Sequence, residues 1–446
     1  MSRLRPALLA CLALACFVAA GSRHAILIEA RHRHALVATR SADDAQLPPS
    51  VALITVALGG FRGLVADILW LRVSHLQEKG ATLEIVQLAD FITKLQPRFA
   101  DVWVFHAWNM AYNVSFTFPN GPDRWRWIKN GIELLRNDGI RLNPDSAALY
   151  LELAWFFQHK VGGGAGTASD RFHMYYKQQL AEEFSEWIGD SPTLQLQRLG
   201  DPDVANRLRR EYGMDPETMR ILTRFYGTLD WRLPYAHAIY WAYQGHQRAE
   251  ARDQIKSNRM LFQSVYATMK KGRLVEDADL DLFATAPSLD VIPRLGIMHE
   301  QALQAFGPGR AVDQYKRFLA EAALLLCEAG RQTQAEGLHR RYLQLLADDE
   351  APPPFERFVY DRYFLQRTGE SPEAVESGIV RVWSRHYYWK AVGDAGYARG
   401  TQSLARMLHR VARASKSTDS IGADLQTTGH TLALKDMPPA LRERLR

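Results

Sequence analysis

A segment of this chain recurs at a fixed offset of 47 residues, and this repeat limits the possible folds more than any other feature. The stretch 95–103, LQPRFADVW, aligns with 142–150, LNPDSAALY. The match extends further, because the Ala-Trp pair at 107–108 recurs at 154–155. A unit of this length with recurring alanine and aromatic positions is typical of stacked helical hairpins, since alanine lets neighbouring helices approach closely. A weaker third copy is predicted at 229–243.

The spacing of apolar residues between about residues 60 and 412 also predicts helices. In the stretch 82–95, the apolar residues recur every three or four positions, with charged residues between them. No run alternates apolar and polar residues for long enough to predict a strand. We therefore expect an all-α chain whose antiparallel helical hairpins stack as an α-solenoid.

Proline and glycine predict where several helices begin and end. A short polar residue followed by proline is a typical helix start, because the side chain accepts an amide hydrogen and proline has no amide hydrogen to leave unpaired. Five such pairs occur: Asn143-Pro144, Ser191-Pro192, Asp201-Pro202, Asp215-Pro216 and Ser371-Pro372. Three glycines are predicted at helix ends, where a left-handed conformation is common: Gly80, Gly213 and Gly330.

These features resemble the tetratricopeptide-like helical repeat proteins. The resemblance rests on a Leu-x-Pro ending of the unit at 95–97 and at 142–144, and on the stretch 324–345, which has Gly330-Arg331 at a turn and Ala335 beyond it. The repeat departs from the usual tetratricopeptide unit of about 34 residues, and the family's Trp-Leu-Gly-Tyr pattern is missing. The resemblance covers roughly half of the chain. It implies that a concave face binds a protein or peptide and that the chain itself catalyses nothing.

The N-terminus has the composition of an export signal. Arg3 and Arg5 precede an apolar run, Ala7–Ala20, which is shorter than the roughly 20 residues of a membrane-spanning helix. Three outcomes remain open: a cleaved signal peptide, an uncleaved membrane anchor, or acylation at Cys16. Each of them exports the rest of the chain, so we expect residues 22–446 on the periplasmic side of an inner membrane or fully exported.

The rest of the chain divides by composition. A second apolar stretch, 51–71, contains Arg62 and Asp67, and charges are costly inside a membrane. We interpret it as a buried first helix, with a membrane-associated segment as the alternative. The predicted segments are a signal or anchor at 1–21, a basic spacer at 22–50, N-terminal repeats at 51–215, central repeats at 216–300, C-terminal repeats at 301–412, and a mobile tail at 413–446 with one short helix near Leu441.

Charge and cysteine content exclude several classes of protein. The net charge is +6, but the 43 arginines and 12 lysines are dispersed, and no nucleic-acid-binding motif accompanies them. Three cysteines exclude a disulfide scaffold, and Cys327 lies in an apolar helix as a small buried residue. The histidines do not have the spacing of metal ligands, because His32 and His34 lie in the basic segment 22–50 and the others are scattered. The glycines of 162–166 predict a loop, because the phosphate-binding pattern is incomplete. We expect no cofactor.

Aromatic residues are the main candidates for binding a partner protein. Trp and Tyr are enriched at protein interfaces, although they also pack between hairpins. The aromatic clusters provide six candidates: Trp125, Trp127, Tyr175, Tyr176, Tyr387 and Tyr388. The repeat-equivalent Trp108 and Trp155 stand beside alanines, so we expect both to be buried between helices.

Two functions remain open from the sequence. The first is a membrane-anchored scaffold or adaptor that binds a protein partner of an envelope complex. The second is an exported all-α enzyme acting on polysaccharides, as a hydrolase or lyase, which requires two carboxylates or a Tyr/His/Arg set in one cleft. Its candidate residues are Asp101, Glu152, Asp230, His237 and Tyr240. The spacing of these residues does not demand a catalytic site, so we favour the scaffold.

Overall fold

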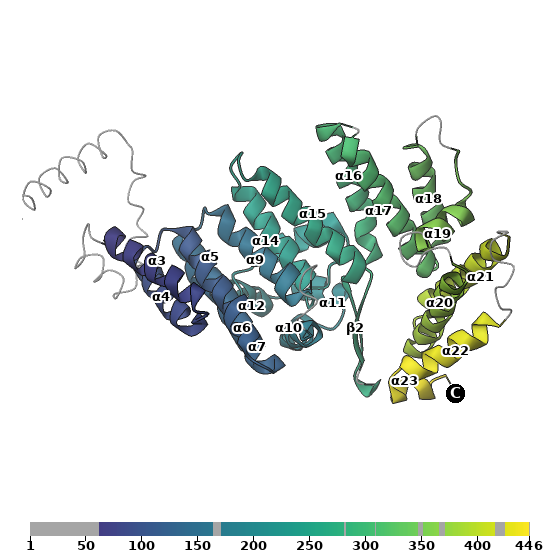
Figure 1. Cartoon of the computed structure of the whole chain (residues 1–446), viewed down its shortest axis with the longest axis horizontal. Coiled ribbons are helices and arrows are strands. Elements are labelled where there is room, and N and C mark those ends of the chain that lie inside the picture. Colours follow the sequence, from purple (N-terminus) through teal and green to yellow (C-terminus); the bar gives the residue numbers. More distant parts are fainter. Residues whose placement is uncertain are drawn as a thin grey trace, which may run out of the picture. The chain divides into compact units, whose positions relative to one another are not determined.

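The computed structural model describes residues 62–163, 171–280, 282–307, 309–346, 351–364, 371–414 and 424–445. Helices make up nearly all of the secondary structure in these ranges, which confirms the predicted all-α class (Figure 1). The predicted signal or anchor at 1–21 and the spacer at 22–50 lie outside them, and so do residues 51–61 and 164–170. The chain divides into two compact units, Met1–Pro97 and Arg98–Arg446. This boundary falls inside the predicted N-terminal repeats.

The described part of the first unit, residues 62–97, forms a helical hairpin of α3 (Arg62–Glu78) and α4 (Thr82–Leu95). Gly80 ends α3 with a φ of 68°, as predicted. One face of α3 packs on α4 and buries residues such as Ala66 and Val73.

The opposite face of α3 is apolar as well, and it is exposed. Leu64, Ile68 and Leu71 are 58%, 57% and 73% exposed. They share this face because residues three and four apart are neighbours on a helix. The prediction of a buried first helix at 51–71 is therefore wrong for the part that the structure describes. No helix in the described ranges combines the length and apolar character needed to span a membrane.

Where the structure describes it, the second unit is a succession of helices with one strand pair. The α-helices are α5 (Ala100–Trp108), α6 (Ser115–Thr117), α7 (Gly121–Glu133), α8 (Ile140–Leu142), α9 (Ala147–Trp155), α10 (His173–Ile188), α11 (Pro192–Arg198), α12 (Pro202–Glu211), α13 (Pro216–Tyr226), α14 (Pro234–Arg248), α15 (Gln254–Lys271), α16 (Ile292–Phe306), α17 (Gly309–Glu328), α18 (Gln332–Leu343), α19 (Phe355–Phe364), α20 (Pro372–Val392), α21 (Ala395–Ala414), α22 (Leu425–Asp436) and α23 (Pro439–Glu443). The π-helical stretches are η3 (Asn109–Val114), η4 (Leu134–Gly139) and η5 (Phe156–Val161). The remaining elements are β1 (Arg273–Asp277), β2 (Leu282–Ala286) and the 3₁₀ turns η6 (Ala278–Leu280) and η7 (Leu289–Val291).

The 47-residue repeat has the same local structure in both copies. The bounds of α9 and η5 equal those of α5 and η3 shifted by 47 residues. The residues before each copy also match, since Gln96 has φ −127° and ψ 59° and Asn143 has φ −137° and ψ 61°. Each copy is thus an α-helix that continues into a π-helical stretch, and π-helical stretches are rare and frequently found at functional sites.

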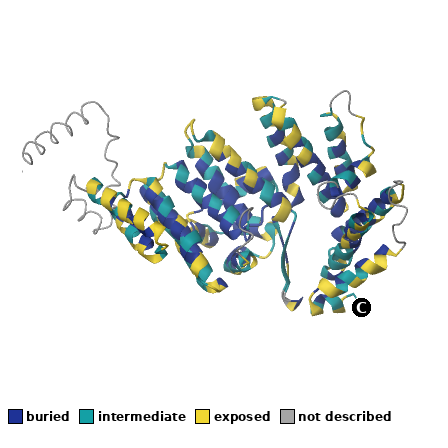
Figure 2. Cartoon of the chain, viewed as in Figure 1, coloured by how far each residue is buried: buried dark blue, intermediate teal, exposed yellow. Residues whose placement is uncertain are grey.

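The core of the second unit lies around α14, which packs against both α9 and α15 (Figures 1 and 2). Ala238 and Ala242 are fully buried and allow this close packing. Trp231 and Trp241, the aromatic residues of the predicted third copy, are buried at 1% and 3% exposure. This helix remains α-helical to its end, so it lacks the π-helical stretch of the other two copies.

Four of the five predicted polar–proline helix starts are confirmed. Ser191, Asp201, Asp215 and Ser371 each accept an amide hydrogen of the following helix. The prediction for Asn143-Pro144 is wrong, because Asn143 ends α8 and its side-chain Nδ2 donates to the oxygen of Gly139 instead. The backbone conformation that ends α8 leaves the next helix to start only at residue 147.

One element departs from the expected absence of strands. The strands β1 and β2 form an antiparallel hairpin in which Arg273 pairs with Ala286 and Asp277 pairs with Leu282. Each strand has five residues, which is too short for a clear alternating pattern in the sequence. Leu274 and Val275 on neighbouring positions are both buried, so the burial of β1 does not alternate either.

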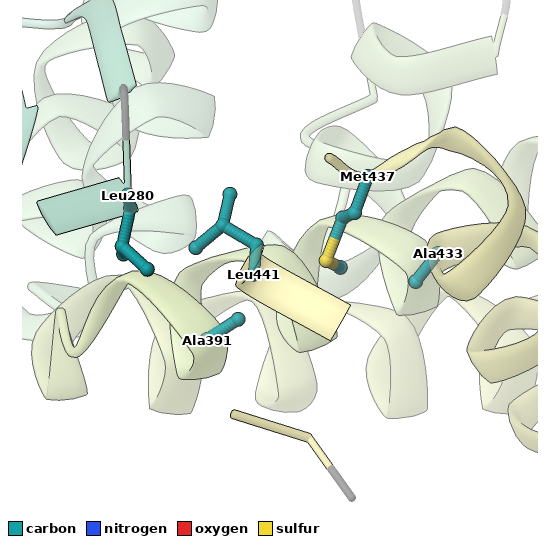
Figure 3. Close-up of a cluster of buried hydrophobic side chains, with 5 residues drawn as sticks. All are labelled: Leu280, Ala391, Ala433, Met437 and Leu441. Atoms are coloured by element: carbon teal, nitrogen blue, oxygen red, sulfur yellow. The ribbon is translucent and has the colours of Figure 1, made fainter. Parts of the chain in front are cut away.

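The tip of this hairpin reaches the C-terminal helices. Leu280 in η6 packs with Ala391 of α20 and with the C-terminal residues Ala433, Met437 and Leu441 (Figure 3). The segment 424–445 therefore holds α22 and α23, both packed on α20, where the sequence predicts a mobile tail with one short helix. The apolar residues that anchor these helices are widely spaced in a polar segment, which conceals them in the sequence.

Candidate binding groove

Four rings from the two repeat copies form two stacked pairs on the second unit, and the pairs meet through the tilted rings of Tyr112 and His159, whose centres are 5.9 Å apart. Trp108 stacks on Tyr112 with ring centres 5.2 Å apart, and Trp155 stacks on His159 at 4.3 Å. The two pairs occupy equivalent positions, since 108 and 112 shifted by 47 give 155 and 159. The Tyr112 hydroxyl is 3.1 Å from His159 Nδ1 and joins the pairs. We call these four residues the aromatic ladder.

The ladder lies where α5 and α9 continue into π-helical stretches. Trp108 and Trp155 are the last α-helical residues before η3 and η5, and their ring partners stand inside those stretches. Both tryptophans stack along the helix surface instead of inserting between helices. Trp108 is 41% exposed and Trp155 is half-buried, so the prediction that both are buried is wrong. The alanines beside them, Ala107 and Ala154, fill the interhelical space.

The ladder leads into a cavity of about 410 Å³ between η5, the start of α14 and α15. Trp155 and His159 form one wall, and Tyr235, Phe262 and Tyr266 add further rings. The remaining lining residues are Gln158, Gly163, Gln263, Ala267, Lys270 and Lys271.

The Tyr235 hydroxyl anchors one edge of this cavity. It donates a 2.7 Å hydrogen bond to the carbonyl oxygen of Gly162, directly after η5. Burial raises the pKa of Tyr235, so the hydroxyl stays protonated as a donor. The bond holds the end of η5 against the start of α14.

Lys270 also lines the cavity, and its charge is neutralised within the chain. Its Nζ lies 3.0 Å from Glu321 Oε1, and the Tyr266 hydroxyl donates to Glu321 Oε2. Burial alone would raise the pKa of Glu321, but the hydrogen bonds from Tyr266 and Lys270 lower it. The Glu321 carboxylate therefore remains charged and paired.

The neighbouring Lys271 is different. No carboxylate in the described part of the chain pairs with Lys271, which lines the same cavity and is exposed. A second lysine, Lys177, is only 3% exposed, and its Nζ lies 5.9 Å from the centre of the Tyr235 ring. Among the described residues, its hydrogen-bond contact is a 3.9 Å approach of Nζ to Met174 Sδ. Burial, and then the charge of Lys271, lower the pKa of Lys177 to about 8.

The six aromatic residues that the sequence singles out lie elsewhere. Trp125 stacks on Tyr176 at 6.0 Å and Trp127 stacks on Phe118 at 6.4 Å, and both tryptophans are half-buried. Tyr176 is fully buried, so the prediction that it binds a partner is wrong. Its neighbour Tyr175 is half-buried.

The C-terminal pair of candidates, Tyr387 and Tyr388, packs within the chain. Both rings contact the apolar cluster at the tip of the strand pair. The hydroxyl of Tyr387 accepts a hydrogen bond from Gln426 Nε2, and its ring contacts His430 at 4.5 Å. These two residues hold α22 on α20.

The aromatic ladder was missed by sequence reasoning, although the sequence contains a signal for it. Each copy has two ring-bearing residues four positions apart, Trp108 with Tyr112 and Trp155 with His159. Such i, i+4 pairs meet on one helix face. The search for adjacent aromatic residues overlooked this spacing.

Three of the residues proposed for an enzyme, Asp230, His237 and Tyr240, lie near Trp231, and each already has a partner within the fold. Asp101 is exposed at the start of α5, whereas Asp230 is buried and paired with Arg232 at 2.8 Å. His237 is buried with its Nε2 2.8 Å from the oxygen of Trp231, and burial lowers its pKa to about 4. The hydroxyl of Tyr240 accepts the amide hydrogen of Asp215. These contacts are structural.

Glu152 is the one candidate carboxylate with unusual acidity. It stands on α9, one turn before Trp155 of the ladder. Burial raises its pKa to about 7, against the opposing charge of Lys256. Burial raises the pKa of Tyr112, and the negative charge of Glu152 raises it further.

A second cavity, of about 520 Å³, is lined by charged residues that, in the described part of the chain, pair with one another, with the exception of Asp190. Asp230 pairs with Arg232, Arg273 with Asp394 at 3.0 Å, and Arg331 with Asp290 at 3.5 Å. Its charges thus serve the fold and leave little for a ligand. Cys327 is buried, and its pKa is raised to about 12 by burial, which excludes it as a thiolate nucleophile at neutral pH.

Across the described ranges, no group of three or more His, Cys, Asp or Glu side chains is arranged to hold a metal ion. No protein-family model matches this chain. A search of curated proteins likewise finds no match. The function must therefore be argued from the geometry of the molecule.

Proposed function

We propose that this protein is a membrane-anchored helical-repeat scaffold whose hairpins stack as a tetratricopeptide-like solenoid. In this proposal the N-terminal segment holds the chain at an inner membrane. The second unit binds an extended segment of a partner protein from an envelope complex. That segment lies along the aromatic ladder and enters the adjoining cavity.

The observation that carries this proposal is the ladder itself. Two repeat copies present equivalent stacked rings, and the outermost, Trp108, is 41% exposed. Large rings that stay partly exposed are typical anchors of protein interfaces, because a partner gains much apolar contact there. The cavity of about 410 Å³ beside Trp155 is large enough for one or two side chains of a partner.

The alternative, an exported enzyme acting on polysaccharides, has one supporting observation. Glu152 has a pKa of about 7, as a general acid at neutral pH requires. Of the two other candidate carboxylates, Asp230 is buried in its ion pair with Arg232 and is not available as a base, and Asp101 is exposed at the start of α5. The scaffold is therefore favoured.

Photo-crosslinking in cells tests the scaffold proposal. Benzoylphenylalanine replaces Trp108 in one strain and Gln263, at the cavity, in another. A matched control carries it at Ile221 of α13, which is 49% exposed but remote in sequence from the ladder. We expect the first two positions to crosslink to one and the same protein, and the control to leave that protein unlabelled.

The scaffold proposal fails if neither groove position crosslinks to a protein while the three variants accumulate equally. It also fails if the position on α13 captures the same protein with equal yield. Release of sugar from polysaccharide by the purified chain, abolished in Glu152→Gln, would favour the enzyme instead.

A further inference from the structure

The cavity beside the ladder contains an excess of positive charge. Lys270 is balanced by Glu321 at 3.0 Å, but neither Lys271 nor Lys177 has a carboxylate partner in the described ranges. This contrasts with the second cavity, where acidic and basic side chains pair. The unbalanced charge therefore belongs to the aromatic cavity.

Burial makes this imbalance costly. Removing an ammonium group from water without a counter-ion costs several kcal/mol, and side chains in that position are usually paired. Lys177 is 97% buried, and its Nζ lies 5.9 Å from the centre of the Tyr235 ring, which lines the cavity. The charge that acts on Lys177 is that of another lysine, Lys271. An anion bound beside Lys271 would reduce the repulsion between the two lysines and supply a counter-charge that the described residues do not provide.

The remaining lining indicates what carries the anion. Trp155, Phe262 and Tyr266 present rings to the cavity, and such rings favour an aromatic or apolar body. We propose that this cavity binds an anionic group attached to an aromatic or apolar body, with Lys271 as its direct contact and Lys177 adding to the positive potential. This inference rests on the proposed function, and it means that the partner segment is acidic and carries a carboxylate beside an aromatic residue.

Two fluorescent probes with a similar aromatic body test the charge preference in the purified full-length protein. 1-Anilinonaphthalene-8-sulfonate carries an anion, and N-phenyl-1-naphthylamine does not. We expect Lys271→Met to raise the Kd of the anionic probe about tenfold, equivalent to about 1.4 kcal/mol, and to change that of the neutral probe less than twofold. The matched control is Lys270→Met, whose lysine is already paired with Glu321, and we expect less than a threefold effect.

A third variant establishes where the probes bind. Ala267 lines the cavity, so Ala267→Phe fills the cavity and should raise the Kd of both probes. Circular dichroism checks that each variant keeps its helices. The proposal is overturned if Ala267→Phe leaves the affinity for both probes unchanged, or if Lys271→Met leaves the affinity for the anionic probe unchanged. Equal effects of Lys270→Met and Lys271→Met would overturn it too.

A peptide competition connects the site to its partner class. The peptide acetyl-Asp-Trp-Asp-amide should displace the anionic probe at a concentration at least tenfold lower than acetyl-Asn-Trp-Asn-amide. Equal potency of the two peptides would overturn the acidic partner. Because the probes report on the cavity of the purified chain and crosslinking reports on a cellular partner, this inference and the scaffold proposal can fail separately.

Discussion

The buried pair of Asp230 and Arg232 organises the loop that precedes α14. Their side chains are 2% and 3% exposed, and Arg232 Nη2 lies 2.8 Å from Asp230 Oδ2. Gln195 of α11 donates to Asp230 Oδ1 at 2.9 Å and accepts the amide hydrogen of Trp231 at 2.8 Å. The network thereby joins α11 to the start of α14, which supports the groove.

Removing one member of this pair leaves the other charge buried. We therefore expect Asp230→Ala to lower the free energy of unfolding by about 3–5 kcal/mol, measured by urea denaturation. The control is Asp290→Ala, which breaks the Asp290–Arg331 pair at the surface and should cost less than about 1 kcal/mol. Equal losses in the two variants would contradict the assignment of the buried network.

Burial raises the pKa of Glu152 from the ordinary value of 4.5 to about 7. This shift makes the free energy of unfolding depend on pH, and its direction gives the sign of the dependence. Between these values the folded chain holds a proton that the unfolded chain has lost. This contribution to stability is complete below about pH 4.5 and is lost as the pH rises through 7.

The variant Glu152→Gln removes the titratable carboxyl, so the protein no longer buries a charge at this position at high pH. We expect it to stabilise the protein at pH 8 by on the order of 1–3 kcal/mol relative to the wild type, with a difference that shrinks towards pH 5. Urea denaturation at both pH values measures it. Since other groups also titrate, only the difference between the two proteins is diagnostic, and a difference independent of pH would contradict the prediction.

At the scale of elements, α3 has two apolar faces with different roles. Val73 is buried against α4, whereas Leu71 is 73% exposed. We expect Val73→Ser to cost more than 1 kcal/mol in unfolding free energy, because it removes buried apolar contacts and buries a hydroxyl. Leu71→Ser should change it by less than about 0.5 kcal/mol. A large loss for Leu71→Ser would mean that another surface covers this face.

The packing of α22 on α20 depends on one glycine. A Cβ added at Gly429 would lie 2.3 Å from Trp383 Cβ and 3.0 Å from the oxygen of Val380. We expect Gly429→Ala to displace α22 at a cost of about 1–3 kcal/mol and to speed amide hydrogen exchange across residues 424–445.

A matched control for this prediction lies in α16. A Cβ at Gly296 would meet no atom within 4 Å. Gly296→Ala should instead stabilise the protein by about 0.5–1 kcal/mol through its helix propensity. If Gly429→Ala leaves hydrogen exchange unchanged, α22 does not pack on α20 as described.

At the scale of the whole molecule, the first prediction concerns location. The apolar run Ala7–Ala20 predicts export, so a phosphatase that is active only in the periplasm should be active when fused after residue 60. Leu12→Arg places a charge in the run and should silence the fusion. A cytoplasmic reporter that is active at the same junction would contradict export and, with it, a partner in the envelope.

The strand pair joins distant parts of the second unit. Its tip places Leu280 among residues of α20, α22 and α23 (Figure 3), and Asp277 pairs with Arg444 at 3.0 Å. These contacts join residues more than 100 positions apart in the chain. No local pattern in the sequence encodes such contacts.

Much of the fold was predictable because its causes are local. The 47-residue repeat recurs in the bounds of α5, η3, α9 and η5, and a polar residue before proline marks four helix starts. Helix periodicity, side-chain caps and left-handed glycines act within a few residues, so the sequence alone determines them.

The candidate site could not be predicted in the same way, because tertiary contacts decide it. The adjacent Lys270 and Lys271 are equivalent in sequence, yet only Lys270 meets Glu321, which comes from α17. Trp108 stands beside an alanine that is fully buried, yet Trp108 itself is 41% exposed. The sequence by itself determined helices, their ends and their repetition. Only the tertiary structure decided which rings stay exposed and which charges find a partner among the described residues, because both depend on neighbours far away in the chain.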